Sequence, residues 1–292
     1  MKLVRCPVCN SNNITHLLTA EDYLVSRDKF QIDSCQNCEL RFTNPRPDDD
    51  KLASYYDSEE YISHSDEDNT IIGKLYKIAR SFALKRKRKL IERLSTNKRL
   101  LDVGCGTGYF IDYCQQHGWQ VSGVEPNDIA RNQAEEKTNI NIKEDLSEIE
   151  ESSFEVITLW HVLEHLPNLE ETLNQLKSLL TPGGVLIIAV PNFEAYEASV
   201  FEENWAAYDV PRHLYHFNRE SIGFLANKHG LKIARTYPMK LDSFYISLLS
   251  NKNKYKANKY ISSFITGLLS NIYAIKSNNY SSLIYQLEKI EV

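Results

Sequence analysis

Four cysteines near the start of the chain form two pairs whose spacing suits metal binding. Two residues separate the members of each pair and 25 residues separate the pairs, which are Cys6, Cys9, Cys35 and Cys38. Each short pair turns both sulfur atoms to one side, so four thiolates can surround one Zn²⁺ and leave no coordination position open. The pattern predicts a structural zinc ribbon. A disulfide pair is disfavoured in a reducing cytosol, and a thioredoxin-like redox motif would need only one pair.

A glycine-rich turn at residues 100–110, reading LLDVGCGTGYF, is the second feature that could do chemistry. An apolar run carrying one acid, Asp102, leads into glycines at positions 104, 106 and 108 and then into an amphipathic run. This order predicts a buried parallel strand, a tight turn and a helix. Glycine tolerates positive φ and lets a ligand lie against the backbone, beside the free N–H groups of a helix N-terminus. A dinucleotide fingerprint would need a third glycine where this chain has Tyr109.

The LLDVGCGTG run resembles the first motif of class I S-adenosylmethionine-dependent methyltransferases, which reads hhDhGCGTG with h apolar. The resemblance implies S-adenosylmethionine (SAM) as the cofactor. It places the amino-acid part of SAM against the loop residues Asp102, Gly104, Cys105, Gly106, Thr107 and Gly108. We expect Cys105 and the remaining cysteine, Cys114, to act as small apolar fillers.

Two acids after the glycine turn are candidates for the nucleoside part of SAM. Glu125 ends the next expected strand, 21 positions after Gly104, where a carboxylate can accept both hydroxyls of a ribose. By its position in the family, Asp145 inherits contact with the adenine amino group; a solvated loop acid is the alternative. The expected cofactor set also includes Pro126, Leu146 and Trp160.

Histidines follow the expected fourth strand in the segment HVLEH, residues 161–165. Ligands of open parallel sheets bind at the carboxyl ends of the strands, so His161 is the first candidate for a catalytic base. The segment resembles EVLEH of ubiquinone-biosynthesis-type methyltransferases, with His161 in place of the first glutamate. In some relatives the acid-x-x-Glu-His set holds a divalent ion, so His161, Glu164 and His165 could do the same. A structural histidine is the open alternative for His165.

An insert at residues 193–217 has the aromatic and polar content of an acceptor-binding loop. It resembles the WxxxxxPxHLxHF segment of uncharacterised small-molecule and sugar methyltransferases. His213 in this insert is the second candidate base, or a side chain that merely fills the loop. The tyrosines Tyr55, Tyr56 and Tyr61 either pack the ribbon onto the main domain or form a lid over the site.

The elements that must position these residues alternate between strands and helices. Strands are expected at residues 100–103, 120–124, 140–143, 154–160, 185–190, 231–237 and 281–288. The fold implied is α/β: a Rossmann-like seven-stranded mixed sheet in the order 3-2-1-4-5-7-6, with helices on both faces, plus a small zinc ribbon. The expected domains are a ribbon (1–45), a linker and helical lid (46–97), and a methyltransferase domain (98–292) with inserts at 193–217 and 246–278.

Two helical segments leave alternatives open. The basic run at residues 85–89 is expected to be a solvated helix end, with attraction of an anionic acceptor as the alternative. Residues 246–278 predict one or two amphipathic helices whose apolar face covers the core, pairs a second subunit or touches a membrane surface. Core cover is the expected outcome.

Length, net charge and hydropathy limit the classes of function that the protein can have. The 292 residues suffice for one large α/β domain and a smaller unit, and the net charge of −5 gives no pull toward nucleic acid. The sequence has no run of eighteen apolar residues and no signal core, so we expect a soluble cytoplasmic protein without a membrane span. A homodimer stays open.

The residues after the fourth strand also bear on the acceptor. They contain no Asn/Asp-Pro-Pro-Tyr/Phe tetrapeptide, the signature of amine methylation in nucleic acids. We therefore expect methyl transfer to oxygen or carbon of a small molecule, such as a sugar or cell-envelope precursor. The alternative is a zinc-ribbon module that binds nucleic acid or protein, with the SAM-binding domain as its scaffold.

Overall fold

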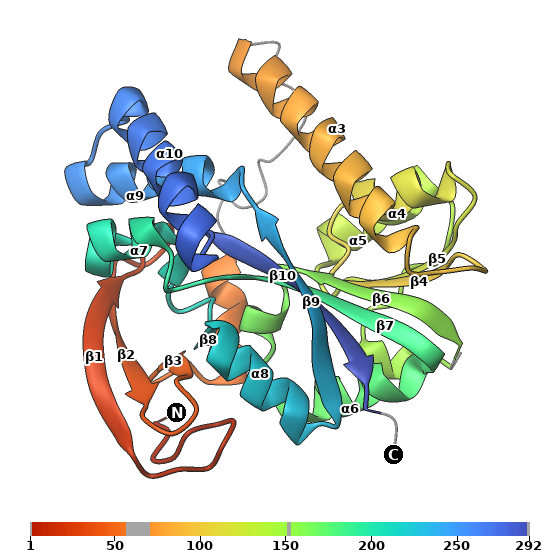
Figure 1. The fold of residues 1–292 in the computed structure, drawn as a ribbon, viewed down its shortest axis with the longest axis horizontal. Coiled ribbons are helices and arrows are strands. Elements are labelled where there is room, and N and C mark those ends of the chain that lie inside the picture. Colours follow the sequence, from red (N-terminus) through yellow and green to blue (C-terminus); the bar gives the residue numbers. More distant parts are fainter. Residues whose placement is uncertain (1, 57–70, 151–152, 291–292) are drawn as a thin grey trace.

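The computed structural model describes residues 2–56, 71–150 and 153–290. Its strands form two sheets (Figure 1). The smaller sheet has four strands in the order β1-β2-β3-β8, with bounds Ile14–Glu21, Lys29–Cys35, Arg41–Thr43 and Tyr215–His216. Its last strand comes from the 193–217 insert, so residues far apart in the sequence complete one sheet.

The larger sheet has six strands in the order β5-β4-β6-β7-β10-β9. In chain order these strands are β4 (Arg99–Val103), β5 (Gln120–Val124), β6 (Phe154–Trp160), β7 (Leu180–Pro191), β9 (Leu231–Met239) and β10 (Ser282–Lys289). Strands β4 to β7 are parallel, and β10 is antiparallel to both of its neighbours. The predicted mixed α/β sheet is confirmed.

The predicted third strand at residues 140–143 is not a strand. Only Lys143 pairs beside β5, in an isolated parallel bridge to Val124 at the edge where the third strand was expected. Two residues later Asp145 caps a short 3₁₀ helix, Leu146–Glu148, so the chain turns away before a ladder can form. The described sheet therefore has six strands instead of the predicted seven.

Helices cover both faces of the larger sheet (Figure 1). The helices of the described residues are α1 (Asp49–Leu52), α3 (Ile71–Ile91), α4 (Tyr109–Gln115), α5 (Asp128–Thr138), α6 (Leu169–Leu179), α7 (Tyr196–Phe201), α8 (Arg219–Lys228), α9 (Asp242–Tyr255) and α10 (Tyr260–Ser277), of which α7, α9 and α10 gather at one end of the molecule. Leu101 and Leu159 belong to a buried cluster with α6 and α8, while Leu100 and Val156 belong to one with α3 and α4. Alternate side chains thus enter opposite cores, which explains why these strands are apolar throughout.

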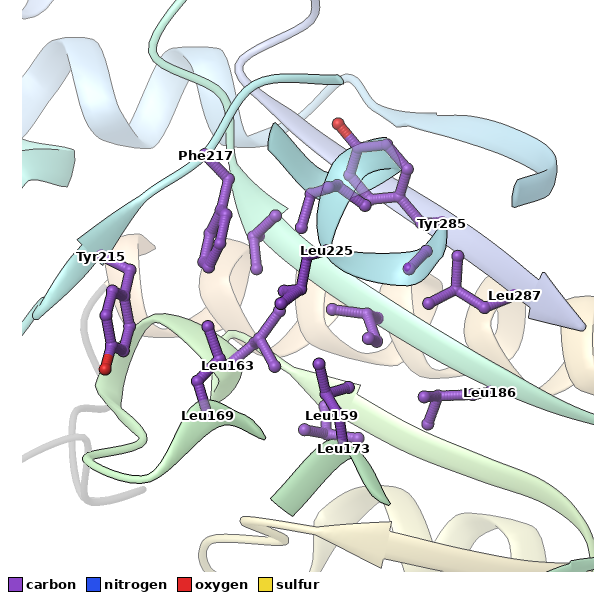
Figure 2. Close-up of a cluster of buried hydrophobic side chains, with 14 of the residues drawn as sticks. Leu159, Leu163, Leu169, Leu173, Leu186, Tyr215, Phe217, Leu225, Tyr285 and Leu287 are labelled. Carbon is purple, nitrogen blue, oxygen red and sulfur yellow. The ribbon is translucent and has the colours of Figure 1, made fainter. Parts of the chain in front are cut away.

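The largest buried cluster extends from the central strands to the N-terminal segment. Figure 2 shows Leu163 and Leu169 beside the aromatic side chains of Tyr215 and Phe217. The same cluster contains Cys6, Val8, Cys35, Cys38, Leu40 and Phe42. The cysteine-bearing segment therefore shares its core with the larger sheet. Cys105 and Cys114 are buried in apolar clusters, as expected for fillers.

The large apolar residues of α10 do not cover the core, so that expectation is wrong for this helix, whereas Ile246 of α9 packs against the buried cluster of the 193–217 insert. Ile261, Phe264, Ile265 and Leu268 are exposed, whereas the buried positions of α10 carry Ser263, Gly267, Ser270 and Ala274. Within the described residues, no helix combines the length and apolarity needed to cross a membrane.

Candidate active site

The glycine loop, residues 104–108, connects β4 to α4 in a conformation that requires glycine at two positions. Gly104 and Gly108 have φ values of +69° and +80°. A Cβ on Gly108 would lie 2.8 Å from the Cα of Ala134, and one on Gly104 would lie 2.5 Å from Val162 Cγ2. Side chains at either position would therefore push apart the loop and its neighbours. Gly106 also has a positive φ, +55°, which favours glycine, but a Cβ there would meet no atom within 4 Å.

Glu125 lies at the carboxyl end of β5, beside the open side of the glycine loop. Its carboxylate accepts hydrogen bonds from the backbone N–H groups of Gly106, at 2.8 Å, and Asn127, at 3.0 Å. Burial raises the pKa of Glu125, although both N–H groups favour its ionised form. The structure thus brings together the two parts of the predicted SAM site, and each carboxylate oxygen keeps a lone pair for a ribose hydroxyl.

Asp102 is buried behind the loop, and the charge of the half-buried Lys87 acts on it. Asp102 is 2% exposed and accepts a hydrogen bond from Thr158 Oγ1 at 2.5 Å. Burial raises the pKa of Asp102 to about 7. Lys87 Nζ lies 4.3 Å from the ring centroid of Trp160, and burial lowers the pKa of Lys87. The expected solvated helix end is therefore only partly correct, because Lys87 turns inward.

Other predicted cofactor residues surround the loop at its surface. Asp145 is exposed and accepts a hydrogen bond from Ser147 N at 2.8 Å, which lowers the pKa of Asp145. Leu146 beside it is buried, and Pro126 is exposed. The Thr107 carbonyl accepts from Lys137 Nζ at 2.7 Å. The geometry gives Asp145 a capping role, and its contact with adenine stays a prediction.

His161 is held between two carboxylates at the end of β6. Its Nδ1 lies 3.4 Å from Glu164 Oε1, and its Nε2 lies 3.4 Å from Asp242 Oδ2. Burial disfavours the imidazolium, but hydrogen bonds and charge from Asp242 and Glu164 raise the pKa of His161 to about 9. His161 also has a φ of +59°, a left-handed conformation found often at functional sites. Its imidazole is therefore protonated at neutral pH.

A second group of titratable side chains lies on the other side of Glu164. The rings of His165 and His213 are 4.6 Å apart, and one ligand atom from each of Glu164, His165 and His213 falls within 4.8 Å of the others. This group could hold a metal ion, with His213 in the place predicted for His161. His165 Nδ1 lies 2.9 Å from the Tyr56 hydroxyl. Burial, together with His213, lowers the pKa of His165 to about 4.

His213 is less accessible than His161. Its Nδ1 lies 2.8 Å from the carbonyl oxygen of Ala207, and its side chain is 10% exposed, against 33% for His161. We call His161, Glu164, His165 and His213 the histidine cluster. Tyr56 contacts His165 of this cluster and also packs against the largest buried cluster, so both the lid and the packing alternatives stay open. Tyr61 lies outside the described residues.

Arg212 fixes the 193–217 insert against the N-terminal segment. It is 1% exposed and donates to Asp22 Oδ1 at 2.9 Å and to Asp209 Oδ1 at 2.7 Å. Its Nη1 donates to the Tyr55 carbonyl at 3.0 Å. Although burial raises the pKa of Asp22, backbone N–H groups and Arg212 hold it below its usual value. One buried cation therefore joins three segments around the histidine cluster.

Sequence reasoning missed several of these residues. Arg212 and Asp22 stand 190 positions apart, and no local pattern connects them. Asp242 carried one signal: it is the single acid in residues 240–280. An isolated carboxylate in a lysine-bearing segment indicates a specific partner, which here is His161.

The four cysteines of the predicted ribbon converge. Their sulfur atoms lie within 4.8 Å of one another, with Cys6 Sγ to Cys38 Sγ at 3.5 Å and Cys9 Sγ to Cys35 Sγ at 3.3 Å. Disulfide sulfurs lie about 2.05 Å apart, so these are free thiols. A tetrahedral Zn²⁺ with Zn–S bonds of about 2.3 Å would separate its sulfurs by roughly 3.8 Å. The cluster therefore fits zinc after a small expansion.

The chain belongs to the methyltransferase domain family, whose sequence model matches residues 77–236. The structure resembles magnesium protoporphyrin IX methyltransferase from Synechocystis PCC 6803 with bound SAH, at a TM-score of 0.53 and 15% identity. That match covers 82% of this chain and 99% of the other. A putative sarcosine dimethylglycine methyltransferase from Galdieria sulphuraria matches with a TM-score of 0.50 and 15% identity, over 83% of this chain and 99% of that one. The class I methyltransferase fold is confirmed.

Curated relatives match a shorter stretch. A ubiquinone biosynthesis O-methyltransferase of Coxiella burnetii is 35% identical over 121 residues, which cover 37% of this chain and 51% of that protein. Its counterpart in Actinobacillus pleuropneumoniae is 30% identical over 138 residues, covering 42% and 58%. The chain therefore spans about half the length of the curated relatives that it matches.

Proposed function

We propose that this protein is an enzyme that transfers a methyl group from SAM to an oxygen atom of a small-molecule acceptor. The observation that carries the proposal is Glu125 at the end of β5, hydrogen-bonded to Gly106 of an open glycine loop. Such a loop and carboxylate suit an amino acid and a ribose in one ligand. Oxygen is favoured over carbon because the curated relatives are named O-methyltransferases.

Each part of SAM has a candidate binding group in this chain. The glycine loop would take the amino-acid part, Glu125 the ribose and Asp145 the adenine. Trp160, which is predicted to contact SAM, lies at the end of β6 next to His161, with its ring centroid 5.5 Å from that of Phe110. When bound, SAM supplies an electrophilic methyl group on a positively charged sulfur.

The reaction requires the acceptor oxygen to attack the methyl carbon in line with the leaving sulfur. The C–S bond breaks as the O–C bond forms, the sulfur keeps the electron pair, and the hydroxyl proton leaves the acceptor. Positioning supplies most of the rate, and a base is needed only to remove that proton. We favour His161 over His213 as the base because His161 is the more accessible. It must first lose its own proton, so the rate should rise with pH up to about 9.

The test is the transfer of labelled methyl from SAM into a host extract separated into small-molecule, lipid, nucleic-acid and protein fractions. Label in the small-molecule or lipid fraction, carried on oxygen when the product is examined by NMR, is the expected result. The double variant Asp102→Ala/Glu125→Ala should lose turnover. Label in protein or nucleic acid would overturn the small-molecule acceptor, and full activity of the double variant would overturn the proposed SAM site. No label in any fraction would favour the zinc-ribbon alternative. A sugar or cell-envelope acceptor stays a prediction that the same separation can check.

A further inference from the structure

In the hairpin formed by α9 and α10, helix α10 carries its large apolar residues on the outside. The exposed fractions of Ile261, Ile265 and Ile272 are 80%, 50% and 51%, and Ile275 is 71% exposed. These residues lie on one helix, and Phe264, Leu268 and Tyr273 between them are also exposed. Contiguous apolar surface of this kind is rare on a soluble monomer and marks an interaction site.

The inner side of the hairpin shows why the apolar residues have no place there. Gly267 is so close to α9 that a Cβ would lie 2.9 Å from the Cα of Phe244. Polar side chains bridge the two helices: Asn251 Nδ2 donates to Ser263 Oγ at 2.9 Å, and Ser243 Oγ donates to the Gly267 carbonyl at 3.0 Å. Small residues at close contact with hydrogen bonds between helices are the packing mode of helices in lipid.

The hairpin itself carries charge of one sign, although the exposed acids Glu202 and Glu203 lie on the short helix that contacts α9. Residues 243–280 contain five lysines and no acid, although the whole chain has a net charge of −5. Four of the lysines lie at the end of α9 and in its connection to α10, at positions 252, 254, 256 and 259. Of these, Lys254 Nζ donates to the Val200 carbonyl at 3.2 Å, and Lys256 Nζ lies 4.4 Å from the ring centroid of Tyr23. Tyr255 and Tyr260 beside them are 48% and 59% exposed. Lysines and tyrosines flanking an apolar helix face are typical of a helix at a membrane interface.

We propose that the outer face of the α9–α10 hairpin docks onto an anionic lipid bilayer and lies in its headgroup region. The apolar side chains would enter the boundary of the acyl chains, and the lysines would contact the phosphate groups. A second copy of this chain fits less well, because a two-fold interface on this face would bring two sets of lysines together. The hairpin lies parallel to the surface, since neither helix can cross a bilayer.

Docking would place the candidate site beside the lipid. Helix α9 begins at Asp242, whose carboxylate lies 3.4 Å from His161 Nε2. Figure 1 shows α9 and α10 together at one end of the molecule, on the side of the larger sheet that carries α3. The histidine cluster would therefore face material held at the membrane.

Flotation of the full chain with vesicles tests this proposal. The wild-type protein should float with vesicles of phosphatidylcholine plus phosphatidylglycerol and much less with phosphatidylcholine alone. The triple variant Ile261→Ser/Ile265→Ser/Ile272→Ser should lower the partition coefficient about tenfold or more. A matched triple at other exposed apolar positions, Val4→Ser/Ile129→Ser/Phe224→Ser, should bind as the wild type does.

Two further measurements test the role of the lysines and the oligomeric state of the protein. Replacing Lys252, Lys254, Lys256 and Lys259 with glutamine should lower binding to the anionic vesicles several-fold and weaken its salt dependence. Equal binding by wild type and the isoleucine triple variant, or no binding at all, would overturn the proposal. So would a dimer in sedimentation equilibrium that the same triple variant dissociates. SAM affinity and circular dichroism of each variant report folding separately, so a failure here leaves the proposed methyl transfer untouched.

Discussion

The glycine loop and the histidine cluster meet where Gly104 packs against Val162, yet the chain builds them differently. The loop and its carboxylate come from one segment, residues 102–125, whose parts are held by backbone hydrogen bonds such as Gly104 N to Val124 O at 2.7 Å. The histidine cluster comes from the segment after β6 and from the 193–217 insert. Tyr56 and Asp242, the first residue of α9, contact it. Local structure thus fixes the predicted cofactor end, which is the glycine loop with Glu125. Long-range packing fixes the histidine cluster, which is the proposed acceptor end.

Loss of zinc should affect the histidine cluster far more than the predicted SAM site, and this is the largest effect that we expect. We expect Cys9→Ser/Cys35→Ser to lose one bound zinc and to disorder β3, which pairs with β8 of the insert. Turnover of the acceptor should then disappear, while the dissociation constant for SAM changes by less than about threefold. Atomic absorption and calorimetry measure the two effects. Cys114→Ser, a buried cysteine outside the ribbon, is the control and should keep the zinc.

Removing the Arg212 side chain tests, without any change of metal, whether long-range contacts hold the histidine cluster in place. Arg212→Leu leaves Asp22, which is fully buried, without its cation, so we expect a loss of about 3–5 kcal/mol in the free energy of unfolding. Urea denaturation measures it. The control Arg27→Leu removes an exposed ion pair to Glu21 and should cost about 1 kcal/mol or less. Equal losses in the two variants would mean that the buried pair does not hold the acceptor end.

A substitution in the glycine loop should instead damage the predicted cofactor end. Gly108→Ala adds a Cβ 2.8 Å from Ala134, and we expect a loss of about 1–3 kcal/mol in stability from the clash together with weaker SAM binding. Gly118→Ala is matched to it, because Gly118 has the same φ of +80° and no atom within 4 Å of the added carbon. It should show only the backbone strain, about 1 kcal/mol. Similar SAM affinities in both variants would contradict the role given to the loop.

The smallest expected effect concerns pH. The pKa of His161 is raised from 6.5 to about 9, so its ion pairs contribute stability that is fully present below pH 6.5 and is lost as the pH rises through 9. The contribution is on the order of 1 kcal/mol, because the side chain is one-third exposed and solvent screens the charges. Asp242→Asn should flatten the stability profile in this window. A profile unchanged by the substitution would show that Asp242 does not set the protonation state of His161.

The sequence by itself determined what depends on neighbours in the chain. Alternating strands and helices, the glycine loop, and Glu125 at the end of β5 all follow from residues a few positions apart. The cysteine pairs were equally readable, because the four thiols of a tetrahedral zinc site need a fixed spacing within each pair.

Tertiary structure decided what depends on partners distant in the sequence. The protonation of His161 follows from Asp242, the position of His213 follows from the fold of its insert, and the inward turn of Lys87 follows from the packing of α3. The exposed face of α10 could not be read either, because an apolar stripe of given spacing looks the same whether it covers a core or faces outward. Burial and charge–charge energies depend on separation in space, and the sequence specifies that separation only once the chain has folded.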